Sequence, residues 1–377
     1  MRRLCILLSL VLTLPLAGCP TSDKNNDEAP PPATHDDARY VPMSTGDRWV
    51  YDYSASLGAP MMMAFGNDTL FQISGITSIN GLATMQLDTP ALSDYALVNQ
   101  SRYLRATSHG LWEYFMPSQA TSVVASPVQL LRFPLIAGDS YATVSKLDQD
   151  ANVDLDNDGL TERRDERVIV TIVGQEAVST PAGDFTRAWK VRRRNEWRMH
   201  YSTGRTTETT VVTDEWLVKD VGVVKRDFVY TTGSGSSSPQ LSEYHYALLR
   251  YAVNGIRSES TPPQVQQVGP AAGSINPPSI HIGASFDELL DIPSLDANSI
   301  RLFDESGMPV AGEVNGDHKT VWFLPYSPLA IGNYTVRIEG ITDAIGNAIA
   351  PQEWTITVVP VEACDNGNVY VCWQPSS

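Results

Sequence analysis

The sequence predicts an all-β protein, in which an antiparallel curved sheet or half-barrel is followed by a smaller β-sandwich. Short segments that alternate apolar and polar residues recur along the chain, and a period of two is typical of strands with one buried face. The 377 residues include 15 Tyr and 8 Trp but only 19% charged residues, a composition that favours strands. Turn dipeptides such as Asn80-Gly81 separate the alternating segments, as they do in β-hairpins.

The first body is expected over residues 40–258. Trp49, Tyr51 and Tyr53 alternate with other residues near its start, so the three rings share one face of a strand. No segment of this body carries a helical period of any length, which leaves an antiparallel sheet as the expected architecture.

Residues 189–201 are expected to form a strand with one apolar and one basic face. The odd positions are apolar apart from Arg193 and Asn195. The basic residues at even positions are Lys190, Arg192, Arg194, Arg198 and His200. Charged strand faces are usually solvated, so we expect this face to form cross-strand ion pairs with the acidic residues of the next strand. A docking stripe for phosphate or an acidic glycan is the alternative. The expected acidic partners are Asp214, Glu215 or Glu208.

A second body is expected over residues 264–360, after a linker at residues 259–263. Its short alternating strands are separated by Pro and Gly turns at regular intervals, and this spacing predicts a β-sandwich. Residues 361–377 form a C-terminal tail.

The N-terminus has the pattern of an export signal, with two arginines before an apolar run over residues 4–16. Residues 16–19, Leu-Ala-Gly-Cys, follow and resemble the lipobox of bacterial lipoproteins. The resemblance implies that residues 1–18 are a signal peptide and that Cys19 is acylated, which anchors the mature chain in a lipid bilayer. An ordinary cleaved signal or an uncleaved anchor is the alternative, although an ordinary signal does not require a cysteine there.

Residues 19–39 are expected to be a disordered tether, because they are polar, acidic and proline-rich and lack an apolar period. In the lipoprotein family, an Asp just after the acylated cysteine favours retention in the inner membrane of some bacteria. Pro20 and Thr21 stand there instead. The expected location is therefore the bacterial cell envelope, with the outer membrane favoured over the inner.

Cysteine usage suits an exported protein. Of the four cysteines, Cys5 leaves with the signal peptide and Cys19 is used by the lipid. Cys364 and Cys372 are then an even pair in a chain bound for an oxidising compartment, so a disulfide between them is expected. Metal binding by this pair is less favoured, because no histidine is near.

Three motifs in the first body are similar to a family of uncharacterised bacterial lipoprotein domains. They are Gly46-x-x-Trp49-x-Tyr51, residues 180–185 (Thr-Pro-Ala-Gly-Asp-Phe) and residues 215–225 (Glu-Trp-Leu-Val-Lys-Asp-Val-Gly-Val-Val-Lys). The resemblance implies a half-barrel like that of periplasmic lipoprotein carriers, with a concave apolar face.

The second body resembles the bacterial Ig-like domains of the S-layer type. Residues 286–291 (Phe-Asp-Glu-Leu-Leu-Asp) are similar to a signature of these domains, and residues 321–338, 343–347 and 354–358 follow in the same order and spacing. The resemblance implies an Ig-like β-sandwich. Asp343 opens a turn in which it is expected to accept backbone amide hydrogen bonds.

The best candidate for chemistry is an acidic segment in the first body, where residues 154–159 read Asp-x-Asp-x-Asp-Gly. Alternate carboxylates can point at one hard cation, and glycine permits the sharp turn after them. The pattern resembles the calcium loops of extracellular bacterial proteins, because no flanking EF-hand helices are expected. We predict weak, structural calcium binding, with an acidic solvated hairpin loop as the alternative. The predicted ligands are Asp154, Asp156, Asp158 and, at the twelfth position, Asp165.

Composition and motifs together favour a protein that is not an enzyme. The net charge of −16 makes nucleic acid an unfavourable partner, and the six histidines are scattered without catalytic or metal-ligand spacing. We expect a membrane-anchored envelope lipoprotein in a binding, adhesion or structural role, with an envelope protein or glycan as partner. The alternatives are a carrier or sensor of an apolar ligand held by the curved sheet, and an envelope glycan-acting enzyme.

Overall fold

The chain divides into two compact units, residues 1–258 and 259–377, and each is described by itself. Cys19 and the pair Cys364 and Cys372 lie outside the residues that the structure describes. In the described part, helix is confined to the short turns η1 (Asp36–Tyr40) and η2 (Ile292–Ser294), and no helix there is long and apolar enough to cross a membrane. The computed structural model describes residues 36–57, 64–93, 96–115, 127–233 and 239–360.

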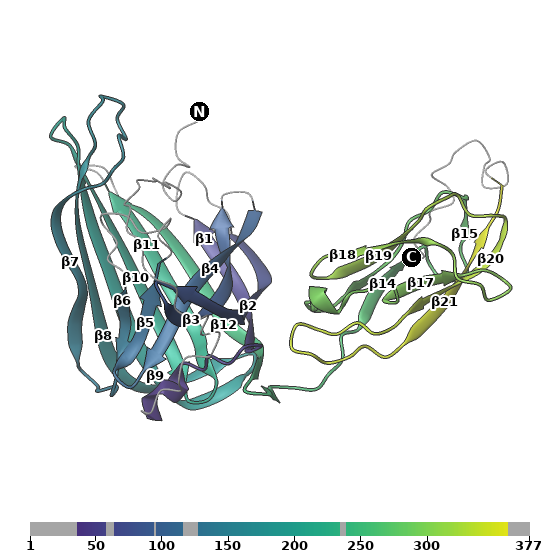
Figure 1. Ribbon diagram of the computed structural model, residues 1–377, viewed down its shortest axis with the longest axis horizontal. Coiled ribbons are helices and arrows are strands. Elements are labelled where there is room, and N and C mark those ends of the chain that lie inside the picture. Colours follow the sequence, from purple (N-terminus) through teal and green to yellow (C-terminus); the bar gives the residue numbers. More distant parts are fainter. Residues whose placement is uncertain (1–35, 58–63, 94–95, 116–126, 234–238, 361–377) are drawn as a thin grey trace. The chain divides into compact units, whose positions relative to one another are not determined.

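The first unit is built on a single antiparallel sheet of 13 strands (Figure 1). The strands are β1 (Arg48–Leu57), β2 (Ala64–Ile79), β3 (Leu82–Ser93), β4 (Ala96–Thr107), β5 (Gly110–Tyr114), β6 (Val128–Arg132), β7 (Ser140–Asp150), β8 (Arg163–Thr180), β9 (Gly183–His200), β10 (Thr206–Val218), β11 (Gly222–Gly233), β12 (Gln240–Val253) and β13 (Ile256–Arg257). Neighbours follow the order β6-β5-β4-β3-β2-β1-β12-β11-β10-β9-β8-β7, and β13 pairs with β12.

The sheet curls until its two edge strands come close together, so it forms a nearly closed barrel. The backbone amide of Arg132, at the end of β6, donates to the Tyr141 hydroxyl on β7 over 2.7 Å. The turn predicted at Asn80-Gly81 is present, with both residues at positive φ. The all-β prediction is therefore confirmed, and the curvature goes further than a half-barrel.

Apolar side chains from several strands pack together inside the barrel. The indole N–H of Trp49 donates to the Val221 carbonyl over 2.6 Å, and the Tyr51 hydroxyl donates to the Val223 carbonyl over the same distance. Gly222, between these two carbonyls, has a φ of +98°. The first and third family motifs therefore contact each other directly. Buried members of this packing include Phe71, Ile73, Leu104, Leu131, Val170, Ile172, Val191 and Leu217.

The last residues of the predicted tether are described by the structure. Residues 36–39 belong to η1, because charged side chains there find partners on the barrel. The Nε of Arg39 donates to Asp220 over 2.6 Å, and a carboxylate oxygen of Asp37 accepts the Leu135 amide over 2.7 Å.

The basic face of β9 forms the cross-strand pairs that the sequence predicts. Arg192 donates two hydrogen bonds of 2.7 Å to Asp214 on β10, and Arg198 pairs with Glu208 on the same strand. Glu215, the third expected partner, faces the barrel interior instead, because β10 alternates its side chains between the two faces.

The second unit consists of two four-stranded sheets around one apolar core. Asp343 accepts the amides of Ile345 and Asn347 over 2.9 and 2.7 Å, as predicted for this turn. The sheet orders are β14-β16-β19-β18 and β15-β21-β20-β17. The strands are β14 (Val265–Gly269), β15 (Ile275–Asn276), β16 (Ile282–Phe286), β17 (Ile300–Phe303), β18 (Gly312–Gly316), β19 (Thr320–Pro325), β20 (Gly332–Ile338) and β21 (Gln352–Val358).

Candidate metal centre

The acidic segment forms the connection between β7 and β8, at the same end of the barrel as the β9–β10 turn (Figure 1). Two backbone hydrogen bonds close this loop, from the Ala151 amide to the Glu162 carbonyl over 2.8 Å and from the Glu162 amide to the Val153 carbonyl over 2.9 Å. Asn157 and Gly159 adopt φ values of 62° and 89°, a left-handed backbone that Asn and Gly tolerate best. The sequence can therefore turn sharply here and bring both ends of the loop together.

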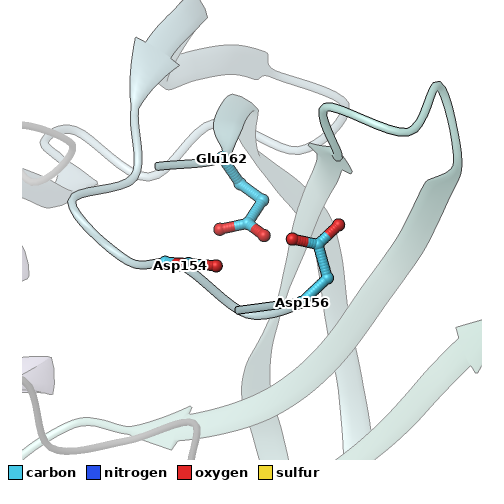
Figure 2. Close-up of side chains that lie close together, drawn as sticks. All are labelled: Asp154, Asp156 and Glu162. Carbon is cyan, nitrogen blue, oxygen red and sulfur yellow. The ribbon is translucent and has the colours of Figure 1, made fainter. Parts of the chain in front are cut away.

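Three carboxylates converge inside this loop. Asp154, Asp156 and Glu162 each place one oxygen so that all three oxygens lie within 4.8 Å of one another. Figure 2 shows the carboxylates of Asp156 and Glu162 pointing toward each other. Calcium binds oxygen at about 2.3–2.6 Å, so two ligands on opposite sides of one ion stand about 5 Å apart. The spacing of the three oxygens therefore fits a single calcium ion.

Hydrogen bonds hold two of these carboxylates in place. The two oxygens of Asp154 accept the amides of residues 157–159 over distances between 2.6 and 3.2 Å. Glu162 is only 2% exposed, and both of its oxygens accept the Leu155 amide over 2.9 Å. These amides preorganise the loop and compensate part of the negative charge.

Asp156 lacks such compensation. Both oxygens of its carboxylate are inaccessible to solvent and accept no hydrogen bond from any described residue. The arginines that open β8 are engaged elsewhere, Arg163 with Asp148 over 2.9 Å and Arg164 with Glu166 over 3.2 Å. Because burying neighbouring negative charges without a counter-charge is costly, the arrangement favours a cation between the three carboxylates.

Asp158, one of the predicted ligands, points away from the cluster. One of its oxygens accepts the Leu160 amide over 2.8 Å, and the other accepts the Ser202 hydroxyl from the β9–β10 turn. The Ser202 hydroxyl, and after it the Leu160 amide, lowers the pKa of Asp158. This carboxylate is therefore satisfied without an ion, and the structure does not bring it into the cluster.

Asp165, the fourth predicted ligand, belongs to β8 rather than to the loop. Its oxygens accept the Asp148 amide over 2.8 Å and contact Nε2 of His200 over 2.9 Å, and these two hydrogen bonds lower the pKa of Asp165. Because β8 begins at Arg163, the twelfth residue of the pattern is already paired into the sheet. Glu162, at the ninth position, closes the cluster instead.

A second acidic cluster lies in the second unit and was not predicted. Glu259, Glu288 and Asp343 also bring one oxygen each within 4.8 Å of one another, and Asp343 is fully buried. The side-chain amide of Asn347 donates to Glu259 over 2.9 Å and to Asp343 over 2.8 Å. Burial raises the pKa of Asp343. Since protein groups satisfy its members, this cluster is a weaker metal candidate than the β7–β8 loop.

Comparison with known proteins identifies the class of the second unit. Residues 259–358 match the family of bacterial Ig-like domains, so the Ig-like sandwich predicted there is confirmed. No curated protein matches the chain.

Two solved structures show weak likeness. CopC from Methylosinus trichosporium OB3b is 19% identical, with 26% of this chain and 94% of that chain covered and a TM-score of 0.23. PcoC, a methionine-rich copper resistance protein from Escherichia coli, is 25% identical, with 26% and 100% covered and a TM-score of 0.24. With TM-scores this low, neither likeness bears on function.

Proposed function

We propose that the protein is a lipid-anchored component of the bacterial cell envelope with a non-enzymatic binding, adhesion or structural role, and that calcium holds the β7–β8 loop of its barrel. The observation that carries the calcium assignment is Asp156, whose buried carboxylate has no donor among the described residues and lies beside Asp154 and Glu162. The anchor rests on the lipobox-like residues 16–19. The Ig-like unit serves as a spacer or contact domain.

The donor set favours calcium over other metals. All members of the cluster are carboxylates, and neither Cys nor His belongs to it within the described ranges, whereas zinc and copper sites use nitrogen and sulfur ligands. Calcium accepts six to eight oxygens in irregular geometry, while magnesium demands a near-ideal octahedron. Three carboxylates, each binding through one or two oxygens, supply much of a calcium shell, and loop carbonyls or water complete it.

Calorimetric titration of the purified protein with calcium tests this proposal. We expect the wild-type protein to bind with a Kd on the order of 10⁻⁴–10⁻³ M, the range of extracellular modules. Asp156→Asn should abolish this binding. Asp158→Asn is the matched control, because this neighbouring carboxylate points away from the cluster, and it should bind like the wild type.

Three outcomes would contradict the calcium assignment. The wild-type protein could give no calcium heat, or both variants could lose binding equally. Binding that survives Asp156→Asn would place the ion elsewhere, for example at Glu259, Glu288 and Asp343.

The interior of the barrel gives the carrier alternative little support. A cavity of about 100 Å³ lies there, whereas pockets for drug-sized ligands usually measure about 300–1,000 Å³. A large apolar ligand therefore does not fit this cavity, and the non-enzymatic envelope role is preferred.

A further inference from the structure

Five charged side chains from five strands face the barrel interior and form what we call the interior ion cluster. Nε of Arg102 lies 2.7 Å from a carboxylate oxygen of Glu113, and Nη2 of Arg226 lies 2.7 Å from one of Glu215. Each glutamate thus has an arginine of its own. The members are Arg102 (β4), Glu113 (β5), Arg193 (β9), Glu215 (β10) and Arg226 (β11).

Arg193 is the one arginine of the cluster that has no carboxylate oxygen of a described residue within hydrogen-bond distance. Its Nη2 stays 3.9 Å from Glu215 and donates a long hydrogen bond of 3.4 Å to the Leu130 carbonyl. Its Nε is buried and has no hydrogen-bond partner among the described residues. A buried guanidinium with an unsatisfied N–H costs free energy, so an acceptor placed beside this atom would be stabilised.

Both glutamates of the cluster are ionised at neutral pH. Burial alone would raise the pKa of Glu215, but the three arginines outweigh it and lower that pKa to about 2. Burial likewise opposes ionisation of Glu113, and Arg102 lowers its pKa nevertheless. The cluster therefore carries three positive and two negative charges. One further negative charge would make it neutral.

The cavity of about 100 Å³ lies directly against this cluster. Four of the five charged side chains contribute to its wall, and most of the rest of the wall is apolar. The wall of the cavity thus combines the guanidinium of Arg193 with apolar side chains. The apolar wall includes Trp49, Phe71, Leu104, Leu111 and Leu217.

We propose that this cavity binds a small organic carboxylate, with its carboxylate group at Arg193 and its short apolar part against the apolar wall. A carboxylate matches the forked donors of a guanidinium and supplies the single negative charge that the cluster lacks. An apolar wall disfavours a strongly hydrated inorganic anion such as phosphate. An engineered cavity of about 150 Å³ holds benzene, so the present volume suits a molecule of roughly four to six heavy atoms.

This site goes beyond the proposed function, since it depends on neither the calcium loop nor the lipid anchor. Titration calorimetry of the purified protein with butanoate tests it, and butanamide serves as the neutral probe of the same shape. We expect butanoate to bind at least tenfold more tightly than butanamide. Octanoate, which exceeds the cavity, and inorganic phosphate should both bind at least tenfold more weakly than butanoate.

Arg193→Met should weaken butanoate binding at least tenfold. Arg192→Met is the matched control, because Arg192 precedes Arg193 in the same strand but faces outward and pairs with Asp214. This variant should bind like the wild type. Asp156→Asn should also retain butanoate binding, which separates a failure of this site from a failure of the calcium assignment.

Equal binding of butanoate and butanamide would overturn the proposal, as would unchanged binding by Arg193→Met or equal losses at Arg192 and Arg193. Octanoate binding as tightly as butanoate would also overturn it. If Arg193→Met does not fold, the comparison of butanoate with butanamide on the wild-type protein still decides the question.

Discussion

Arg193 and Asn195 interrupt the apolar face of β9, and both carry a buried polar atom without a hydrogen-bond partner among the described residues. In the sequence, these two residues are polar at positions where a strand facing an apolar core would carry apolar side chains. In the structure, Arg193 belongs to the interior ion cluster and lines the interior cavity. The polar residues on the apolar face of β9 thus correctly indicated polar groups inside the barrel. The sequence could not reveal the rest of the cluster, because Arg102 and Glu113 come from strands on the far part of the sheet path.

Glu215 should make the stability of the barrel depend on acid pH. Its pKa is about 2 in the folded protein, against an ordinary value of 4.5, so its contribution is complete above about pH 4.5 and is lost as the pH falls through about 2. The difference corresponds to about 3 kcal/mol. Glu215→Gln should therefore lower the free energy of unfolding by about this amount at pH 7 and flatten its decline between pH 5 and pH 2, as measured by urea unfolding.

Glu196→Gln provides the control for this comparison. Glu196 pairs with Arg194 on the outer face and its side chain is 37% exposed, so its replacement should change stability by less than about 1 kcal/mol. Parallel pH profiles for the wild-type protein and Glu215→Gln would show that the interior ion cluster does not act as described.

At the scale of the element, the β7–β8 loop was predicted in part. Alternate aspartates and the glycine correctly indicated that Asp154 and Asp156 converge. Asp165, the predicted closing residue, does not reach the other two carboxylates, because it already belongs to β8. Strand boundaries are the least certain part of a pattern in sequence, and β8 takes in Asp165 while Glu162 lies just before it. Glu162 stands at the ninth position, where such loops often contribute a ligand.

The β10–β11 turn should tolerate no side chain at Gly222. Its φ is +98°, and a Cβ there would lie 3.3 Å from Cδ of Pro42 and 3.3 Å from Nε1 of Trp49. Gly222→Ala should therefore lower the free energy of unfolding by about 1–3 kcal/mol, measured by urea unfolding. Gly75→Ala, at a strand position with no atom within 4 Å of the added Cβ, should be neutral or slightly stabilising. Equal effects of the two substitutions would contradict the packing of the third family motif.

At the scale of the molecule, alternation, turn dipeptides and composition were sufficient to predict an all-β chain, and four segments in a characteristic order and spacing predicted the Ig-like unit. Closure of the barrel was not predictable. It depends on β6 approaching β7 across a connection that carries no strand pattern, through contacts such as Arg132 with Tyr141. The sheet curvature that makes this possible arises from the summed twist of many strands, which no single segment of the sequence encodes.

The location of the whole molecule should depend on one atom. If the Cys19 sulfur carries the lipid, Cys19→Ser should move the protein from the membrane fraction to the soluble fraction of the envelope, because a single short anchor is then lost. Immunoblotting of fractionated cells measures this distribution. An unchanged membrane fraction would mean that the lipobox-like segment does not anchor the chain.

Hydrogen exchange of the β7–β8 loop tests the central claim most directly, because it reports both the binding of calcium and the place of binding. We predict that calcium, relative to a chelator, slows amide exchange in peptides covering residues 151–162 and leaves those of β11 and β12 unchanged. Asp156→Asn should remove this protection, and Asp158→Asn should keep it. Equal exchange rates of the wild-type loop with calcium and with chelator would contradict the account.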